Sequence, residues 1–183
     1  MIHIRTENGL EKFTEEEATA YENGYLIYEN GKWTIDTSCD NYISCKKEDK
    51  ISLLKTKFQE YKDTHIRLDY DSNTYYIKAT EDTMIEASTR ELRVDQLSDP
   101  ITNELDRSWF SDFNASLESD IIQIIFSSKL ELQTFLGKIG QYFQSKKQVY
   151  LVAKQQILSA TTIAELEAID LEAIDWGSNI IEV

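Results

Sequence analysis

Residues 129–150 read KLELQTFLGKIGQYFQSKKQVY and decide the fold, because their apolar side chains recur every three or four positions. This spacing predicts one long amphipathic helix from Ser128 to Leu158, with Ser128 and Glu131 as a capping-box pair at its start. The apolar stripe consists of Leu132, Phe135, Leu136, Ile139, Phe143, Tyr150 and Leu151. Gly137 and Gly140 each weaken the helix by roughly 1 kcal/mol relative to alanine, which indicates a close backbone approach or a kink.

The helix runs into an acidic segment, SATTIAELEAIDLEAIDW (159–176), which contains a tandem duplication of LEAID. Thr162 and Glu165 form a second capping box and predict a short last helix. The apolar side of this segment is formed by Leu166, Ile169 and Ile174, and Trp176 follows as a residue that we expect to be exposed. The carboxylates expected in water are Glu165, Glu167, Asp170, Glu172 and Asp175. Packing and charge without a reactive group favour binding over catalysis.

The N-terminal residues predict a small module of one helix and one hairpin. Residues 2–5 alternate as a short strand, and the capping box at 14–17 (TEEE) precedes a helix over 15–23. In GYLIYENGKWTID (24–36), Asn30-Gly31 can adopt the positive φ angles that a two-residue hairpin turn requires. This is the clearest hairpin signal in the chain.

Two further strand pairs are predicted downstream. Residues 66–70 and 74–78 alternate in polarity and flank Ser72-Asn73, which predicts a second hairpin. Residues 108–113 (SWFSDF) and 121–126 (IIQIIF) predict a third pair, because short β-branched and aromatic runs favour buried strands.

Two more helices are expected between these strands. Residues 37–44 are expected to form a loop, and residues 46–63 then predict a helix with a narrow apolar stripe. The stripe is Ile51, Leu54, Phe58 and Tyr61. It packs within the chain or pairs with copies of itself as a short coiled coil, and two heptads favour the former. Residues 81–94 predict a helix whose inner side is Met84, Ile85, Ala87, Ser88 and Leu92.

Together these elements predict an α+β fold in which antiparallel hairpins pack against the long C-terminal helix. We expect three parts along the chain. Residues 1–45 form the helix-hairpin module, residues 46–64 form a linking helix, and residues 65–183 form the main α+β domain.

The chain of 183 residues carries a net charge of −14, which is distributed unevenly. Residues 81–127 carry −8 and residues 159–183 carry −6, whereas residues 128–158 carry +4. Such an acidic chain repels nucleic acid and anionic membranes and attracts a basic protein surface. Solubility alone is the simpler explanation of this charge.

The residues with metal or redox chemistry form no recognisable site. Cys39 and Cys45 fit neither a zinc quartet nor a disulfide framework, so we expect free thiols, with a local disulfide as the alternative. His3 and His65 lie too far apart for a His-x-x-His pair. The segment 69–73 (DYDSN) resembles the start of a calcium loop but lacks its glycine and its bidentate glutamate, so we expect hairpin-turn carboxylates.

The sequence also lacks the glycine-rich motifs that cradle phosphate and the Gly-x-Ser-x-Gly turn of hydrolases. We therefore expect no catalytic residue, no cofactor and no bound metal. There is neither a secretory signal at the first residues nor a run of about 20 apolar residues, so we expect a protein of the host cytoplasm or of an assembled particle.

Three segments resemble an uncharacterised domain of tailed-phage and prophage tail genes, found in tail-fibre-associated proteins and beside fibre-assembly chaperones. They are the aromatic hairpin LDYDSNTYYIKA (68–79), the tryptophan-bearing RSWFSDF (107–113), and the helix containing GKIG (137–140) with its terminus ATTIAELEAIDLEAIDW (160–176). The similarity covers about residues 65–176. The first hairpin departs from the family in having Asp-Ser-Asn in place of a glycine turn, and the duplication of LEAID is also unusual. The family has no established catalytic residues.

These observations favour a non-enzymatic phage or prophage protein that binds other proteins, as a tail component or a fibre-assembly factor. The expected partner is then a tail or fibre protein, or a further copy of the chain, bound through the Ile51–Tyr61 stripe or Trp176. The alternative is an acidic inhibitor of a host defence nuclease complex that imitates nucleic acid through the carboxylates concentrated in residues 81–127 and 159–183. The candidate interaction residues of the second segment are Glu165, Glu167, Asp170, Glu172 and Asp175. A hydrolase with an unrecognised site is the third hypothesis.

Overall fold

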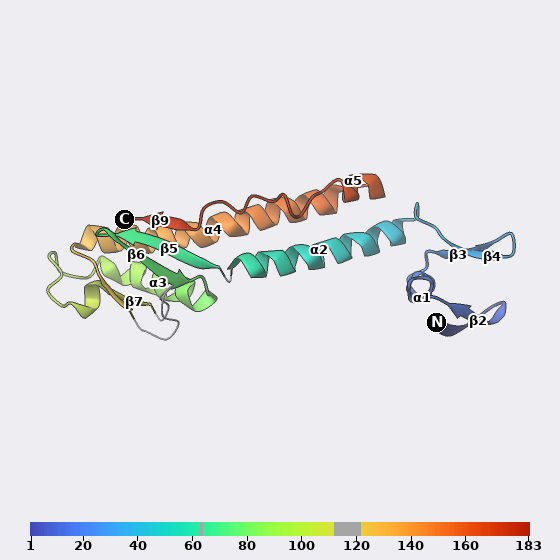
Figure 1. Cartoon of the computed structure of the whole chain (residues 1–183), viewed down its shortest axis with the longest axis horizontal. Helices are drawn as coiled ribbons and strands as arrows, with labels where there is room; N and C mark the ends of the chain where they lie inside the picture. Colours follow the sequence, from blue (N-terminus) through green and yellow to red (C-terminus); the bar gives the residue numbers. More distant parts are fainter. Residues whose placement is uncertain (63, 112–121) are drawn as a thin grey trace. The chain divides into compact units, whose positions relative to one another are not determined.

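The structure is a computed structural model that describes residues 1–62, 64–111 and 122–183, and its fold is α+β as the sequence predicts (Figure 1). The elements in chain order are β1 (Ile2–Thr6), β2 (Gly9–Phe13), α1 (Glu15–Glu22), β3 (Leu26–Glu29), β4 (Lys32–Ile35), α2 (Asp40–Lys62), β5 (His65–Tyr70), β6 (Asn73–Lys78), α3 (Glu81–Val94), the 3-10 turn η1 (Leu105–Arg107), β7 (Ser108–Ser111), β8 (Ile122–Ile125), α4 (Lys129–Ser159), α5 (Ile163–Glu167) and β9 (Ile180–Glu182).

The chain divides into two units. The first unit contains residues 1–55 and 152–173, and the second contains residues 56–151 and 174–183. Their boundaries fall inside α2 and α4, whereas the sequence placed its boundaries at the two ends of a linking helix.

The first unit begins with two hairpins and the short helix α1 between them. The capping box of α1 is confirmed, because the Glu17 N–H donates to Thr14 Oγ1 at 3.1 Å and the Thr14 N–H donates to the Glu17 carboxylate at 2.8 Å. The turn between β3 and β4 is confirmed as well, with φ of 52° at Asn30 and 78° at Gly31. The core of this part is Phe13, Ala18, Ala20, Tyr25 and Leu26.

The sequence missed β2, which pairs antiparallel with β1. Its residues, GLEKF, include a glycine and two charges, and only Phe13 is buried. Because only one side chain of this strand is buried, its sequence does not alternate between polar and apolar residues in the way that predicts a strand. Phe13 is held by the ring of Trp33 at 5.5 Å and the ring of Tyr21 at 5.9 Å.

The helix α2 begins at Asp40, so the predicted loop at 37–44 is wrong in its second half. No glycine or proline interrupts residues 37–46, and polar residues alone do not stop a helix. The first turn is capped by Cys39, whose Sγ accepts the N–H of Tyr42 at 3.3 Å.

In the second unit, β5 lies between β6 and β9 in a three-stranded sheet (Figure 1). The β5–β6 hairpin is antiparallel as expected, and β9 adds parallel to β5 with Leu68 opposite Ile181. Alternate residues of the sheet, among them Ile66, Leu68 and Ile77, are buried in one core. The same core includes Leu132, Phe135, Leu136 and Ile139 of α4, which confirms the predicted packing of hairpin against helix.

The third strand pair is present as β7 and β8, which place Trp109 opposite Ile124. The indole of Trp109 packs edge-on against Phe135 with ring centroids 5.1 Å apart. The predicted strand residues 112, 113 and 121, and the connection between the strands, lie outside the described residues.

The helix α3 has the predicted bounds, and its predicted inner face is correct for Met84 and Ala87 only. Ile85 and Leu92 are 54% and 80% exposed, and Ser88 is exposed too, whereas Ala87 and Val94 are buried. The guanidinium of Arg90 lies 5.6 Å from the ring centre of Trp109. A cation that stacks on an aromatic ring can face a core. Hydrophobicity alone therefore does not identify Arg90 as a residue of the inner face.

The helix α4 also follows the prediction at its start, where the Glu131 N–H donates to Ser128 Oγ at 3.2 Å. Two details differ: Leu151 is 46% exposed, and Lys146 is only 1% exposed. A Cβ added at Gly140 would meet nothing within 4 Å, and one at Gly137 would meet only Glu91 Oε1 at 3.8 Å. Neither glycine therefore marks a close backbone approach.

The β5–β6 turn makes a testable prediction, because it has no glycine although Asp71 and Ser72 have φ of 48° and 60°. An L-residue in this region costs about 1–2 kcal/mol. We expect Ser72→Gly to raise the free energy of unfolding by about 0.5–1 kcal/mol in urea titrations, after the entropy of glycine is subtracted. Ser72→Ala, which brings no freedom at positive φ, should give no increase; an equal increase would contradict the explanation.

Candidate functional site: a lysine clamp and two grooves

The stripe predicted on α2 packs within the chain, which was the favoured alternative to a coiled coil. Leu54 is fully buried, and Ile51 is half-buried. Phe58 stacks on Tyr150, with ring centroids 4.8 Å apart. These side chains are therefore used inside the molecule.

The structure brings three of the predicted site residues together as an aromatic stack in the second unit. The indole of Trp176 lies 5.7 Å from the ring of Phe58 and 5.5 Å from the ring of Tyr61, nearly parallel to both. Trp176 is half-buried, so the expectation that it is exposed was wrong. Sequence spacing could not pair it with residues more than a hundred positions away.

Beside this stack lies a site that the sequence did not reveal, which we call the lysine clamp. The Lys146 ammonium donates to the Ser178 carbonyl at 2.8 Å, to the Tyr61 hydroxyl at 3.2 Å, and to the Trp176 carbonyl. It also lies 4.7 Å and 4.8 Å from the ring centres of Tyr61 and Tyr142. The Tyr61 hydroxyl in turn donates to the Gly177 carbonyl at 2.7 Å. The clamp thus holds three consecutive carbonyls.

The clamp is built to hold rather than to react. All three ammonium hydrogens have acceptors, and the aromatic faces stabilise the cation further. Burial lowers the pKa of Lys146, and the carboxylate of Asp175 opposes that shift. Burial also raises the pKa of Tyr61 and of Tyr142. A nucleophilic lysine needs a free lone pair and an open approach, and this one has neither.

An open groove of about 530 Å³ runs along the clamp in the second unit. One wall is α4 and the other is the segment from Asp175 to Glu182. Its lining includes Lys138, Gln141, Ser145, Val149, Asp175 and Ile180.

A second groove, of about 370 Å³, lies between α2 and α5 in the first unit. Its apolar lining is Tyr42, Leu53, Ile163 and Leu166, and its charged lining is Lys46, Asp49, Lys50 and Glu167. The Lys50 ammonium donates to the Leu166 carbonyl at 2.6 Å. Nearby, Lys47 donates to the Leu158 carbonyl at 2.8 Å. These lysines satisfy carbonyls near helix C-termini, where the helix dipole favours a cation.

The two copies of LEAID differ in secondary structure, because only the first begins on a helix, but each ends in the same aspartate contact. Asp170 Oδ1 accepts the N–H of Glu172, and Asp175 Oδ1 accepts the N–H of Gly177, both at 2.8 Å. Leu166 and Leu171 are the buried leucines of the two copies. The carboxylates at 165, 167, 170, 172 and 175 are all exposed, as expected, but at least three of them also shape the backbone.

Glu165 is the capping residue of α5, and this role makes a pH prediction. Its carboxylate accepts the N–H of Thr161 at 2.6 Å and that of Thr162 at 3.3 Å. These bonds, with that of the Thr161 hydroxyl, lower the pKa of Glu165. A lowered pKa in the folded state means that the unfolded chain takes up the proton more readily. The stabilisation is present above the ordinary pKa of about 4.3 and is lost as the pH falls through the folded value.

We therefore expect Glu165→Gln, which keeps the capping geometry but cannot titrate, to flatten the loss of stability below about pH 4. Urea midpoints measured at several pH values test this. Glu167→Gln removes a carboxylate outside the capping box and is the matched control. Identical acid profiles for wild type and Glu165→Gln would contradict the role assigned to the cap.

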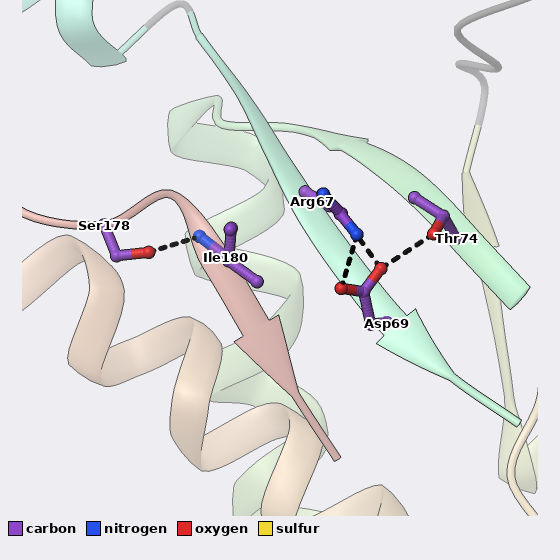
Figure 2. Close-up of polar contacts among 5 residues, drawn as sticks. All are labelled: Arg67, Asp69, Thr74, Ser178 and Ile180. Carbon is purple, nitrogen blue, oxygen red and sulfur yellow. Dashed lines mark hydrogen bonds and ion pairs between the residues drawn. The ribbon is translucent and has the colours of Figure 1, made fainter. Parts of the chain in front are cut away.

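The hairpin-turn interpretation of residues 69–73 is confirmed. Asp69 forms an ion pair with Arg67 at 2.9 Å and accepts the hydroxyl of Thr74 at 2.8 Å (Figure 2). The Arg67 partner also holds the pKa of Asp69 below its usual range. The carboxylate of Asp69 is thus used by two neighbouring side chains of the hairpin. Within residues 1–62, 64–111 and 122–183, no three His, Cys, Asp or Glu side chains are grouped to hold a metal.

Both cysteines are free thiols. Cys39 directly precedes α2 and Cys45 lies on it, and six residues along a helix rise about 9 Å, beyond the roughly 7 Å between Cα atoms that a disulfide spans. The alternative of a local disulfide is thereby removed.

The chain matches no protein-family model, no curated protein and no solved structure. Among the helices of the described residues, none has the length and apolar character needed to cross a membrane.

Proposed function

We propose that this chain is a non-enzymatic phage or prophage protein that acts by binding other proteins, as a tail-associated structural component or a fibre-assembly factor. The resemblance to tail-gene domains motivates the tail assignment. Of the residues that carry it, 68–70 and 73–78 lie on β5 and β6, 108–111 on β7, 137–140 on α4 and 163–167 on α5, whereas residues 168–176 form no helix or strand.

The observation that carries the binding proposal is the chemistry of the groove between α2 and α5. Leu53 is 52% exposed at its edge, next to the half-buried Ile163 and Tyr42. Lys50 is engaged with a carbonyl, and the Lys46 ammonium lies 5.4 Å from the ring centre of Tyr42. An open apolar surface with a charged rim is typical of protein interfaces.

Light scattering during size-exclusion chromatography, with co-purification of tail proteins, tests this proposal. We expect either a defined self-associated species or a complex with a tail or fibre protein. Leu53→Glu places a charge on the groove and should weaken that association at least tenfold, whereas Leu105→Glu, at an exposed leucine of the other unit, is the control. A strict monomer to which no tail protein binds would contradict the proposal.

One observation favours the alternative of a nuclease inhibitor. The helix α3 and the residue after it carry five exposed carboxylates: Glu81, Asp82, Glu86, Glu91 and Asp95. Such an array can occupy a basic nucleic-acid groove, and binding should then weaken steeply with salt. Pull-downs against host nuclease complexes at low and high salt test this; salt-insensitive binding, or none, argues against mimicry.

A further inference from the structure

Residues 174–183, which we call the strap, fill a site that the rest of the second unit builds. The Trp176 ring occupies the slot beside Phe58 and Tyr61, and Ile181 is buried in the main core. Between them the backbone pairs with β5, where the Arg67 N–H donates to the Asn179 carbonyl at 2.8 Å. The strap is therefore bound through the side chains of Trp176 and Ile181 and through the backbone between them.

The surface that contacts the strap is formed by elements that also pack against other parts of the second unit. Phe58 stacks on Tyr150 as well as on Trp176. The sheet strand β5 pairs with β6 over six residue pairs but with β9 over only three. The side of β5 that faces the strap is thus an edge that this short segment completes.

The strap forms the outer edge of the sheet, and part of this edge is already hydrogen-bonded within the unit. Successive residues of a strand direct their backbone groups to opposite sides, so Ile180 and Glu182 face away from β5. The Ile180 N–H donates to Ser178 Oγ at 3.0 Å (Figure 2). The Glu182 carbonyl accepts from the Lys138 ammonium. These two edge groups are therefore not available to another chain. A partner strand that takes the place of the strap has all of the pairing groups on the strap's side of β5 at its disposal.

We infer that the strap is the internal occupant of a strand-acceptor site. Its competing occupant is an extended segment of a partner protein with an aromatic side chain and, five residues later, an aliphatic one. The segment pairs parallel to β5, seats its aromatic ring beside Phe58 and Tyr61, and gives its carbonyls to Lys146 and Tyr61. This inference rests on the proposed function, since it names the kind of partner that the protein binds.

The test weakens the strap and leaves the acceptor intact. A labelled synthetic peptide of residues 174–183, IDWGSNIIEV, is titrated in fluorescence anisotropy against the full chain and against the double variant Trp176→Ala/Ile181→Ala. In the wild type the tethered strap has a high effective concentration and excludes the peptide. We expect the double variant to bind the peptide at least tenfold more tightly than the wild type.

Two controls separate the site from unspecific binding. A peptide with alanine in place of the aromatic and aliphatic residues should not bind. Adding Lys146→Met to the double variant should weaken binding at least tenfold, because the acceptor then lacks its clamp. Equal binding by wild type and double variant, or equal binding of both peptides, overturns the inference.

If the double variant does not fold, the single variant Trp176→Ala replaces it, and hydrogen exchange of the wild type gives a test without any substitution. The Arg67 amide faces the strap, whereas its neighbours Ile66 and Leu68 face β6. We expect Arg67 to exchange at least tenfold faster than they do, through opening of the strap. Equal protection of all three amides overturns the inference.

If these tests fail, the proposed binding of a partner at the α2–α5 groove is not contradicted. If the peptide binds but no tail protein does, the proposed function is contradicted and the strand-acceptor site is not.

Discussion

Lys146→Met is expected to lower the free energy of unfolding by about 2–4 kcal/mol, although it removes a buried charge. Two effects compete. Methionine relieves the burial of an ammonium that is 1% exposed. It also leaves the Trp176 and Ser178 carbonyls and the Tyr61 hydroxyl without their donor, and these acceptors are partly shielded from water. A fully buried acceptor without a donor costs about 1–3 kcal/mol, so three partly buried ones cost less than three times that amount. Leaving three acceptors without a donor costs more free energy than is gained by removing one desolvated cation, because that cation was fully hydrogen-bonded.

Urea denaturation followed by far-UV circular dichroism measures this effect. Lys147→Met makes the same chemical change one residue along α4, at an exposed position, and should change the stability by less than about 0.5 kcal/mol. If Lys146→Met is as stable as Lys147→Met, the clamp does not hold the strap.

Trp109→Ala is expected to have the largest effect on stability, a loss of about 3–5 kcal/mol, as is usual for a large aromatic residue deleted from a core. Trp109 is 2% exposed and packs between Phe135 and the guanidinium of Arg90. Its removal leaves a cavity and also takes away the surface on which Arg90 is stacked.

The neighbouring residue on β7 provides the control. Phe110 is 47% exposed on the opposite side of the strand, so Phe110→Ala should lose less than about 1 kcal/mol. Far-UV circular dichroism is the suitable signal, because it does not depend on the deleted indole. Similar losses for the two variants would contradict the assignment of Trp109 to the core.

The sequence predicted those parts of the fold that depend on neighbouring residues. The three predicted capping boxes, at Thr14, Ser128 and Thr162, are four-residue patterns, and all three are present. The Asn30-Gly31 turn depends only on two residues that tolerate positive φ. The long stripe of α4 repeats often enough that a single exception, Leu151, does not hide it.

The parts that were missed depend on contacts between distant segments. The strand β9 has three residues and pairs with β5 more than a hundred positions earlier, so it has no local signal. Lys146 stands beside Lys147 and resembles one of two solvated lysines, and only Tyr61, Tyr142 and the carbonyls of residues 176–178 make it a buried one. The candidate site was foreseen only as the separate residues Phe58, Tyr61 and Trp176.

Isothermal titration calorimetry of the purified chain with purified phage tail-fibre proteins tests the central proposal, that this protein works by binding a protein partner, most directly. We predict saturable binding to one of them with a fixed stoichiometry and a negative heat-capacity change, which is the mark of apolar surface being buried. Absence of binding to every tail and fibre protein tested, together with turnover in a broad hydrolase substrate screen, would contradict the proposal.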